Sequence, residues 1–232
     1  MGLVYLINGK EEGAIKKYKD VLKNRKDAVK ELKDIIPMHR LKEESWDLIA
    51  VSKAGLVLAS MIKGSLENNI DFLFSEAILA PNNSECEIAR VSESEEIVIN
   101  EELVSAFEIQ YDYIYGEARR KHEEKILSYI YKYRKGRHFS DVTNKVVLLV
   151  DEGSETGMKF MTALKTILVQ KPKAVYIAVP VLPTDVLELL EPYADDIFFL
   201  HAIDDFVETE LYYQELEDID EETIEKLLEE KK

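Results

Sequence analysis

The chain has 232 residues, 46% of them hydrophobic, which is enough to build an enzyme-sized domain around a buried core. Its formal net charge of −16 argues against nucleic acid as a partner, because binding to phosphate backbones depends on dense Lys and Arg. The chain has a single cysteine, and its N-terminus is unlike a signal peptide. It also lacks an apolar run of the ~18–20 residues that cross a bilayer. These observations predict a soluble cytoplasmic protein without a membrane partner.

The N-terminal part of the chain is expected to be helical. Apolar residues recur at helical spacing over 14–36, and Pro37 ends the pattern. We therefore assign residues 1–44 to an N-terminal helical extension. Leu48 to Val51 then form a short apolar run typical of a buried strand, followed by a tight loop and an apolar helix over 56–67.

The middle of the chain contains the most irregular pattern. Residues 70–79 resemble a strand, and Pro81-Asn82-Asn83 supply turn chemistry at the start of a segment over 80–100 that we expect to be a projecting loop or hairpin. Residues 101–135 have the apolar spacing of helices, and Gly136 ends them.

From residue 145 onward, apolar strands alternate regularly with helices. The expected order is strand 145–151, helix 156–169, strand 174–181, helix 184–191 and strand 196–200. This alternation predicts an α/β core with a central parallel sheet covered by helices on both faces, which we assign to residues 45–203. The remaining residues, 204–232, are strongly acidic and are expected to be helical. Ligands of such sheets bind beyond the carboxyl ends of the strands, which directs attention to the loops after Val51 and Val150.

The loop after Val150 has the composition of a phosphate site. Two carboxylates, Asp151 and Glu152, end the apolar strand, and the loop that follows contains Gly153, Ser154, Thr156 and Gly157. Glycines allow close backbone approach, hydroxyls donate hydrogen bonds, and the N-terminus of the next helix attracts anions. The alternative is an ordinary turn in which Asp151 and Ser154 cap the helix.

The pattern strand-Asp-Glu-x-x-x-Thr-Gly resembles the phosphoribosyl-pyrophosphate (PRPP) motif of type I phosphoribosyltransferases. The resemblance implies the fold of that family, a parallel sheet flanked by helices. It also implies that Asp151 and Glu152 bind the ribose hydroxyls of PRPP. The 5-phosphate would then be bound by Gly153, Ser154, Thr156, Gly157, Met158 and Lys159.

A second match lies about a hundred residues earlier. Ser52, Lys53, Ala54 and Gly55 follow a strand and resemble the family's pyrophosphate loop, which implies that they bind the pyrophosphate and that Lys53 assists its departure. Residues 80–89 resemble the pattern Ala-Pro-x-Asn-x-Glu-x-x-Ile-Ala of predicted phosphoribosyltransferases of bacteria and archaea. In that group this segment would be a mobile loop that covers PRPP, whereas a surface hairpin is the alternative.

Two further residues are candidates for contact with the acceptor base. Glu155 stands directly before Thr-Gly, where purine phosphoribosyltransferases carry an acid that acts on the purine ring; an exposed loop charge is the alternative. Phe206 lies in a segment that resembles the one carrying a base-stacking aromatic in purine enzymes, and core packing is the alternative.

The resemblance implies an enzyme that binds PRPP with Mg²⁺, transfers the phosphoribosyl group to a nucleobase-like acceptor and releases pyrophosphate. The Mg²⁺ would be bound mainly through PRPP and water, with no protein metal site. A non-catalytic regulatory module that binds PRPP or nucleotides on the same fold is the main alternative, and a protein for another phosphorylated ligand is the third. A homo-oligomeric assembly is left open.

Overall fold

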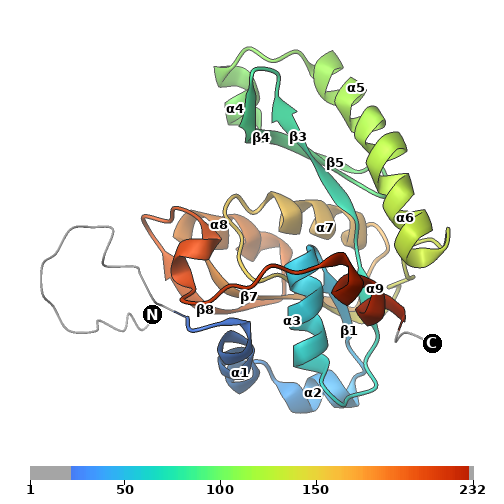
Figure 1. Ribbon diagram of the computed structural model, residues 1–232, viewed down its shortest axis with the longest axis vertical. Coiled ribbons are helices and arrows are strands. Elements are labelled where there is room, and N and C mark those ends of the chain that lie inside the picture. The colour runs from blue at the N-terminus through green and yellow to red at the C-terminus, as the bar shows by residue number, and fades with distance from the viewer. Residues whose placement is uncertain (1–21, 230–232) are drawn as a thin grey trace, which may run out of the picture.

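Five parallel strands form the central sheet of the computed structural model, which describes residues 22–229 (Figure 1). Their order in the sheet is β2-β1-β6-β7-β8. The strands are β1 Asp47–Ala50, β2 Ile70–Phe72, β6 Val146–Val150, β7 Ala174–Pro183 and β8 Asp196–Ile203. Ala50 of β1 lies opposite Val150 of β6, so the loops that follow these two strands emerge side by side.

Helices cover both faces of this sheet, as predicted. Side chains alternate between the faces, so that Leu48 and Leu148 pack in one core and Ile49 and Leu149 in the other. The first core also contains residues of α1 Arg25–Ile35, α2 Met38–Glu43 and α3 Lys53–Lys63, and the second contains residues of α7 Met158–Leu168 and α8 Thr184–Leu190. A short 3₁₀ turn, Glu191–Tyr193, follows α8. The predicted α/β fold class is confirmed.

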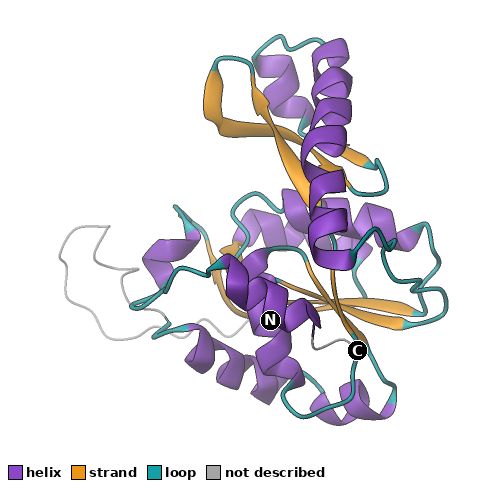
Figure 2. Cartoon of the chain, turned by 45° about the vertical axis from the view of Figure 1, so that its right-hand side comes forward, coloured by secondary structure: helices purple, strands orange, loops and turns teal. Residues whose placement is uncertain are grey.

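A second layer rises from the carboxyl-end side of the sheet, and we call it the hood (residues 75–134; Figures 1 and 2). It contains a three-stranded antiparallel sheet in the order β3-β4-β5, packed against helices. The elements are β3 Ser75–Ala80, β4 Asn83–Ser92, β5 Ile97–Ile99, α4 Glu101–Ala106, α5 Tyr111–Lys121, a π-helical turn His122–Ile126 and α6 Leu127–Arg134. The predicted hairpin and the predicted helices after it are therefore confirmed.

The prediction of one strand over 70–79 is wrong, because this run contributes strands to two different sheets. β2 ends at Phe72, and the next two residues turn the chain from the sheet into the hood. Leu73 packs in one core and Phe74 in the other. The Phe74 amide and carbonyl both bond to Glu93 instead of continuing β2, at 2.9 Å each. A continuous apolar run therefore conceals a change of sheet.

The C-terminal segment is only partly helical. After a 3₁₀ turn at Thr209–Tyr212 the described chain becomes helical again at α9 Glu221–Glu229, which contacts α3 and α6. Tyr213 instead forms an isolated parallel bridge with Leu22, which requires extended backbone. The predicted N-terminal helix begins at Arg25 within the described range, and its residues 14–21 lie outside that range. None of the helices described over residues 22–229 is both long and apolar enough to span a bilayer.

Candidate functional site

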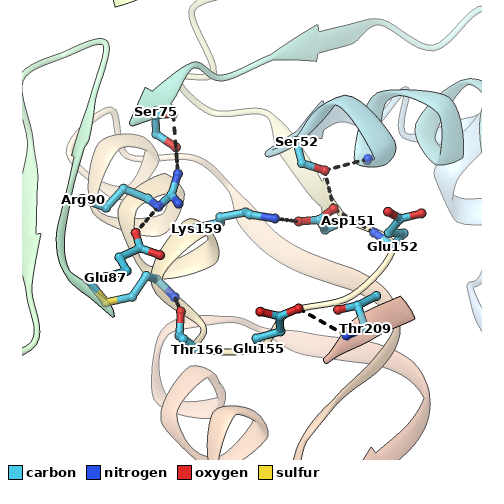
Figure 3. Close-up of polar contacts among 12 residues, drawn as sticks. Ser52, Ser75, Glu87, Arg90, Asp151, Glu152, Glu155, Thr156, Lys159 and Thr209 are labelled. Carbon is cyan, nitrogen blue, oxygen red and sulfur yellow. Dashed lines mark hydrogen bonds and ion pairs between the residues drawn. The ribbon is translucent and has the colours of Figure 1, made fainter. Parts of the chain in front are cut away.

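Ser52 connects the two loops that sequence analysis singled out. Its hydroxyl accepts a hydrogen bond from the Gly55 amide at 2.9 Å, which makes Ser52 the N-cap of α3, and donates one to Oδ1 of Asp151 (Figure 3). The prediction of a tight loop before a helix at residue 56 is wrong here, because this cap starts the helix at Lys53. Lys53, Ala54 and Gly55 therefore form the first helical turn.

Gly55 allows this helix to lie against the neighbouring strand. A Cβ atom at this position would be 2.2 Å from the carbonyl oxygen of Val150. Only glycine permits so close an approach without moving the backbone. The start of α3 is thereby held next to Asp151.

Asp151 is 1% exposed and has hydrogen-bond partners on both carboxylate oxygens. Oδ1 accepts from Ser52 and from the Glu152 amide at 2.8 Å, while Oδ2 accepts from Nζ of Lys159 at 3.3 Å. The negative charge of Asp151 raises the pKa of Lys159, so that the ammonium group stays charged. Asp151 therefore organises both loops and the first turn of α7.

Glu152 points away from Asp151 toward the N-terminal helix. Its Oε2 forms an ion pair with Nε of Arg25 at 2.7 Å, and the two side chains are 16% and 13% exposed. Burial raises the pKa of the Glu152 carboxyl, and the Arg25 charge opposes this effect. The Tyr213 hydroxyl donates to the Glu152 carbonyl at 2.8 Å.

The rest of the loop leads directly into α7. Gly157 is the N-cap, with a left-handed φ of 71° and no side-chain cap bond. The alternative in which Asp151 and Ser154 cap this helix is therefore wrong. Thr156 Oγ1 accepts from the Met158 amide at 3.4 Å, and the Met158 side chain is buried, so that Met158 offers only its backbone to a ligand.

Glu155 and Gly153 contact the C-terminal segment. Oε1 of Glu155 accepts from the Thr209 amide at 3.2 Å (Figure 3). A Cβ atom on Gly153 would be 2.3 Å from Cγ2 of Thr209, so glycine is needed there for packing. The Ser154 amide donates to the Val181 carbonyl at 3.3 Å, and its side chain is buried.

A cavity of about 190 Å³ lies between the loops and the hood. Its cationic groups come from three elements, Lys53 of α3, Lys159 of α7 and Arg90 of β4. Glu76 is the acidic residue of the lining, and Ser52 and Ser75 add hydroxyls. The apolar walls are formed by Val51, Phe72, Phe74, Tyr129 and Tyr133. The net positive lining suits an anion next to an organic group.

Arg90 was missed by sequence reasoning. It is 9% exposed and is held by Glu87 at 2.7 Å through Nε and by the Ser75 hydroxyl at 3.1 Å through Nη1 (Figure 3). The signal available in the sequence was a single basic residue between Ala89 and Val91 in an apolar strand. A charge in such a place needs a partner or a function, since unpaired burial is costly.

Two predicted residues lie at the margin of this arrangement or outside it. The Lys53 side chain is half exposed, and its Nζ lies 3.7 Å from Glu221 of α9. The Phe206 ring lies against Tyr212, with ring centroids 4.7 Å apart, and does not line the cavity. Its role as a base-stacking residue stays a prediction.

Comparisons with known proteins support the family resemblance. No protein-family model matches the sequence. The crystal structure of TT1426 from Thermus thermophilus superimposes with a TM-score of 0.71 at 25% identity, covering 90% of this chain and 98% of that one. Two Mycobacterium tuberculosis proteins, each named "Putative phosphoribosyl transferase", are 22% identical over 153 residues. The resemblance to type I phosphoribosyltransferases is confirmed.

This phosphoribosyltransferase similarity covers 66% of the chain but only 34% of the mycobacterial proteins. The chain thus spans about a third of the length of the curated relatives it matches. A hypoxanthine phosphoribosyltransferase from Staphylococcus aureus also aligns, over 85% of each chain, with 13% identity and a TM-score of 0.44.

Proposed function

We propose that the protein is a phosphoribosyltransferase that binds PRPP and Mg²⁺, transfers the phosphoribosyl group to a nitrogenous base and releases pyrophosphate. The observation that carries this proposal is the hydrogen bond between Ser52 and Asp151. It joins the predicted pyrophosphate segment (residues 52–55) to the loop that begins with the predicted ribose ligands, which we call the ribose segment (residues 151–155), beside one cationic cavity. Segments that bind two parts of one substrate have to lie next to each other, and this hydrogen bond supports the proposal by bringing Ser52 and Asp151 together.

The geometry supports a specific position for each part of PRPP. The 5-phosphate would lie at the N-terminus of α7, where the helix dipole and the start of the helix at Gly157 favour an anion. Glu152 would accept from a ribose hydroxyl through Oε1, because Oε2 is already bound to Arg25. The pyrophosphate would occupy the cavity between Lys53, Arg90 and Lys159.

The reaction would form a bond from the acceptor nitrogen to C1 of the ribose while the bond from C1 to the pyrophosphate oxygen breaks. Negative charge then develops on the departing pyrophosphate, and the three cations would stabilise it. Glu155 would take the proton that the acceptor nitrogen loses. The hood would exclude water from the reacting carbon.

Magnesium would arrive with the substrate. Within the described residues 22–229, no three His, Cys, Asp or Glu side chains gather as metal ligands. Asp151 already has partners on both oxygens. This donor set fits an ion held by phosphate oxygens and water, which needs no protein ligand and would neutralise charge on the leaving group.

The test is calorimetry with PRPP and Mg²⁺, followed by detection of pyrophosphate with a panel of purines and pyrimidines. Asp151→Asn and Glu152→Gln should each abolish measurable PRPP affinity. Glu188→Gln, which changes an exposed carboxylate on α8, is the matched control and should bind PRPP like the unmodified protein. Unchanged affinity in both site variants would disprove the site assignment.

A non-catalytic PRPP-binding module is the second candidate. It is favoured by the pairing of Asp151 with Lys159, because a residue paired in this way is less available to the reacting groups. PRPP binding without pyrophosphate release from any acceptor would decide for this module.

A further inference from the structure

The start of the described chain pairs with the segment before α9 beside Glu152, and we call this contact the clasp (residues 22–25 and 209–217). The Leu22 amide donates to the Tyr212 carbonyl, and the Gln214 amide donates to the Leu22 carbonyl, each at 2.9 Å. The Glu215 amide donates to the Lys23 carbonyl, also at 2.9 Å. The clasp is thus a short paired structure built from sequence outside the β1-to-β8 region.

The clasp touches the ribose segment at successive positions. Arg25 pairs with the Glu152 side chain, and the Tyr213 hydroxyl binds the Glu152 carbonyl. Thr209 packs against Gly153, and its amide binds Glu155. Both the carboxylate and the backbone of the second ribose acid are therefore fixed from outside the sheet.

Arg25 is itself held in place. Its Nη1 donates to the Glu217 carbonyl at 2.5 Å, while Nε donates to Glu152. One guanidinium therefore links α1, the C-terminal segment and the ribose segment. Its planar arrangement of donors fixes the direction of the Glu152 carboxylate, which a flexible ammonium group does less well.

We propose that Arg25 is a positioning residue for the ribose of PRPP, which orients Glu152 so that Oε1 accepts from a ribose hydroxyl. This inference rests on the proposed function. A carboxylate with one oxygen bound by Arg25 has a single orientation, whereas a free carboxylate rotates and loses entropy when the ligand binds. Arg25 does not touch the ligand and acts through Glu152.

Arg25 also lowers the pKa of Glu152 and so opposes the effect of burial. The groups that act on this carboxyl are Arg25 from α1, Asp151 and Lys159 from the site, and burial beside Tyr213. Burial and Asp151 raise the pKa of Glu152, and the two cations lower it. Without Arg25 the pKa of Glu152 rises further. Glu152 then takes up a proton at a higher pH, and a protonated carboxyl accepts fewer hydrogen bonds than a carboxylate.

The experiment compares Arg25→Gln and Arg25→Lys with a matched control, Arg40→Gln, which breaks an exposed Arg–Glu pair on α2. Binding of PRPP, ribose 5-phosphate and inorganic pyrophosphate is measured by calorimetry from pH 5 to 8. Arg25→Gln should weaken PRPP and ribose 5-phosphate about 10- to 100-fold, as when a partner that orients a liganding group is removed. Pyrophosphate affinity should be unchanged, since pyrophosphate does not contact Glu152.

The pH profile separates positioning from a merely structural role. In Arg25→Gln the loss of ribose 5-phosphate affinity on acidification should begin at a higher pH than in the unmodified protein, and Arg25→Lys should restore part of the shift. Unchanged ribose 5-phosphate affinity, or an equal loss for all three ligands with an unshifted profile, would overturn the inference. If the unmodified protein binds neither PRPP nor ribose 5-phosphate, the proposed function itself fails and the inference falls with it.

Discussion

Ser52 and Asp151 lie 99 residues apart in the chain, and the hydroxyl of the first donates to the carboxylate of the second. Because Ser52 also caps α3, a single hydroxyl sets both the start of that helix and the position of the buried acid. The two predicted ligand segments therefore depend on each other.

Replacing Ser52 with Ala should affect both stability and binding. Loss of the cap should lower the free energy of unfolding by about 0.5–2 kcal/mol, and PRPP affinity should fall because Asp151 loses a donor. Asn100→Ala removes the cap of α4, where Asn100 accepts from the Leu103 amide at 3.0 Å, far from the site. Urea unfolding should show similar losses for both variants, while calorimetry should show weaker PRPP binding only for Ser52→Ala. Equal PRPP affinity in the two variants would contradict the link.

Replacement by Ala should change the free energy of unfolding in opposite directions at Gly55 and Gly116. A Cβ on Gly55 meets the Val150 carbonyl at 2.2 Å, so Gly55→Ala should cost about 1–3 kcal/mol or more by overpacking. A Cβ on Gly116, in the exposed middle of α5, meets nothing within 4 Å, so Gly116→Ala should gain roughly 0.5–1 kcal/mol. Chemical denaturation measures both changes. A stable Gly55→Ala protein would show that α3 is free to move away from β6.

The contact between Gly153 and Thr209 can be tested by a double-mutant cycle. Gly153→Ala should be destabilising, because its Cβ would lie 2.3 Å from Cγ2 of Thr209. Thr209→Gly removes all the clashing side-chain atoms. The double variant should therefore lose less free energy of unfolding than the sum of the losses in the two single variants. Additive losses in the free energy of unfolding would show that the C-terminal segment does not pack on the loop.

The base of the hood holds a buried ion pair, Arg134 with Glu93, whose side chains are 5% and 3% exposed. Nε and Nη1 of Arg134 have no hydrogen-bond partner among residues 22–229, and the guanidinium carbon lies 4.6 Å from the Phe74 ring centroid. Arg134→Met leaves Glu93 as an unpaired buried carboxylate and should cost about 3–5 kcal/mol at neutral pH. Arg120→Met, which breaks exposed pairs on α5, should cost less than about 1 kcal/mol.

The cost of Arg134→Met should depend on pH. Burial already raises the pKa of Glu93 above its usual value, and losing Arg134 raises it further. A carboxyl with a raised pKa in the folded state binds its proton more tightly there, so its destabilising effect is present at neutral pH and fades as pH falls. Unfolding curves between pH 4 and 7 should show the deficit shrinking on acidification. A constant deficit would contradict this account of Glu93.

The sequence predicted the elements whose signal is local. Alternating apolar strands and helices from residue 145 onward specified β6, α7, β7, α8 and β8, because periodicity and burial coincide there. The start of α3 was misplaced because Gly55 was interpreted as a loop glycine, whereas it serves close packing against Val150. The strand over 70–79 was misjudged because Leu73 and Phe74 are equally apolar but belong to different cores.

The site was predictable only in part, for a related reason. Asp151, Glu152 and Ser52 could be proposed from the sequence because they follow strands and ligands of parallel sheets bind at the carboxyl ends of the strands. The Arg25 pairing with Glu152 joins residues 127 positions apart, and no local pattern encodes such a contact. Arg90 likewise reaches the cavity only because the hood folds over the sheet.

The hood comes from one uninterrupted stretch of chain, residues 75–134, inserted between strands β2 and β6. Both predicted ligand segments lie outside that stretch, at residues 52–55 and 151–159. The cavity residues on the hood side, Ser75, Glu76, Arg90, Tyr129 and Tyr133, therefore all come from one continuous stretch, so that a change confined to it alters one wall of the cavity and leaves residues 52–55 and 151–159 as they are.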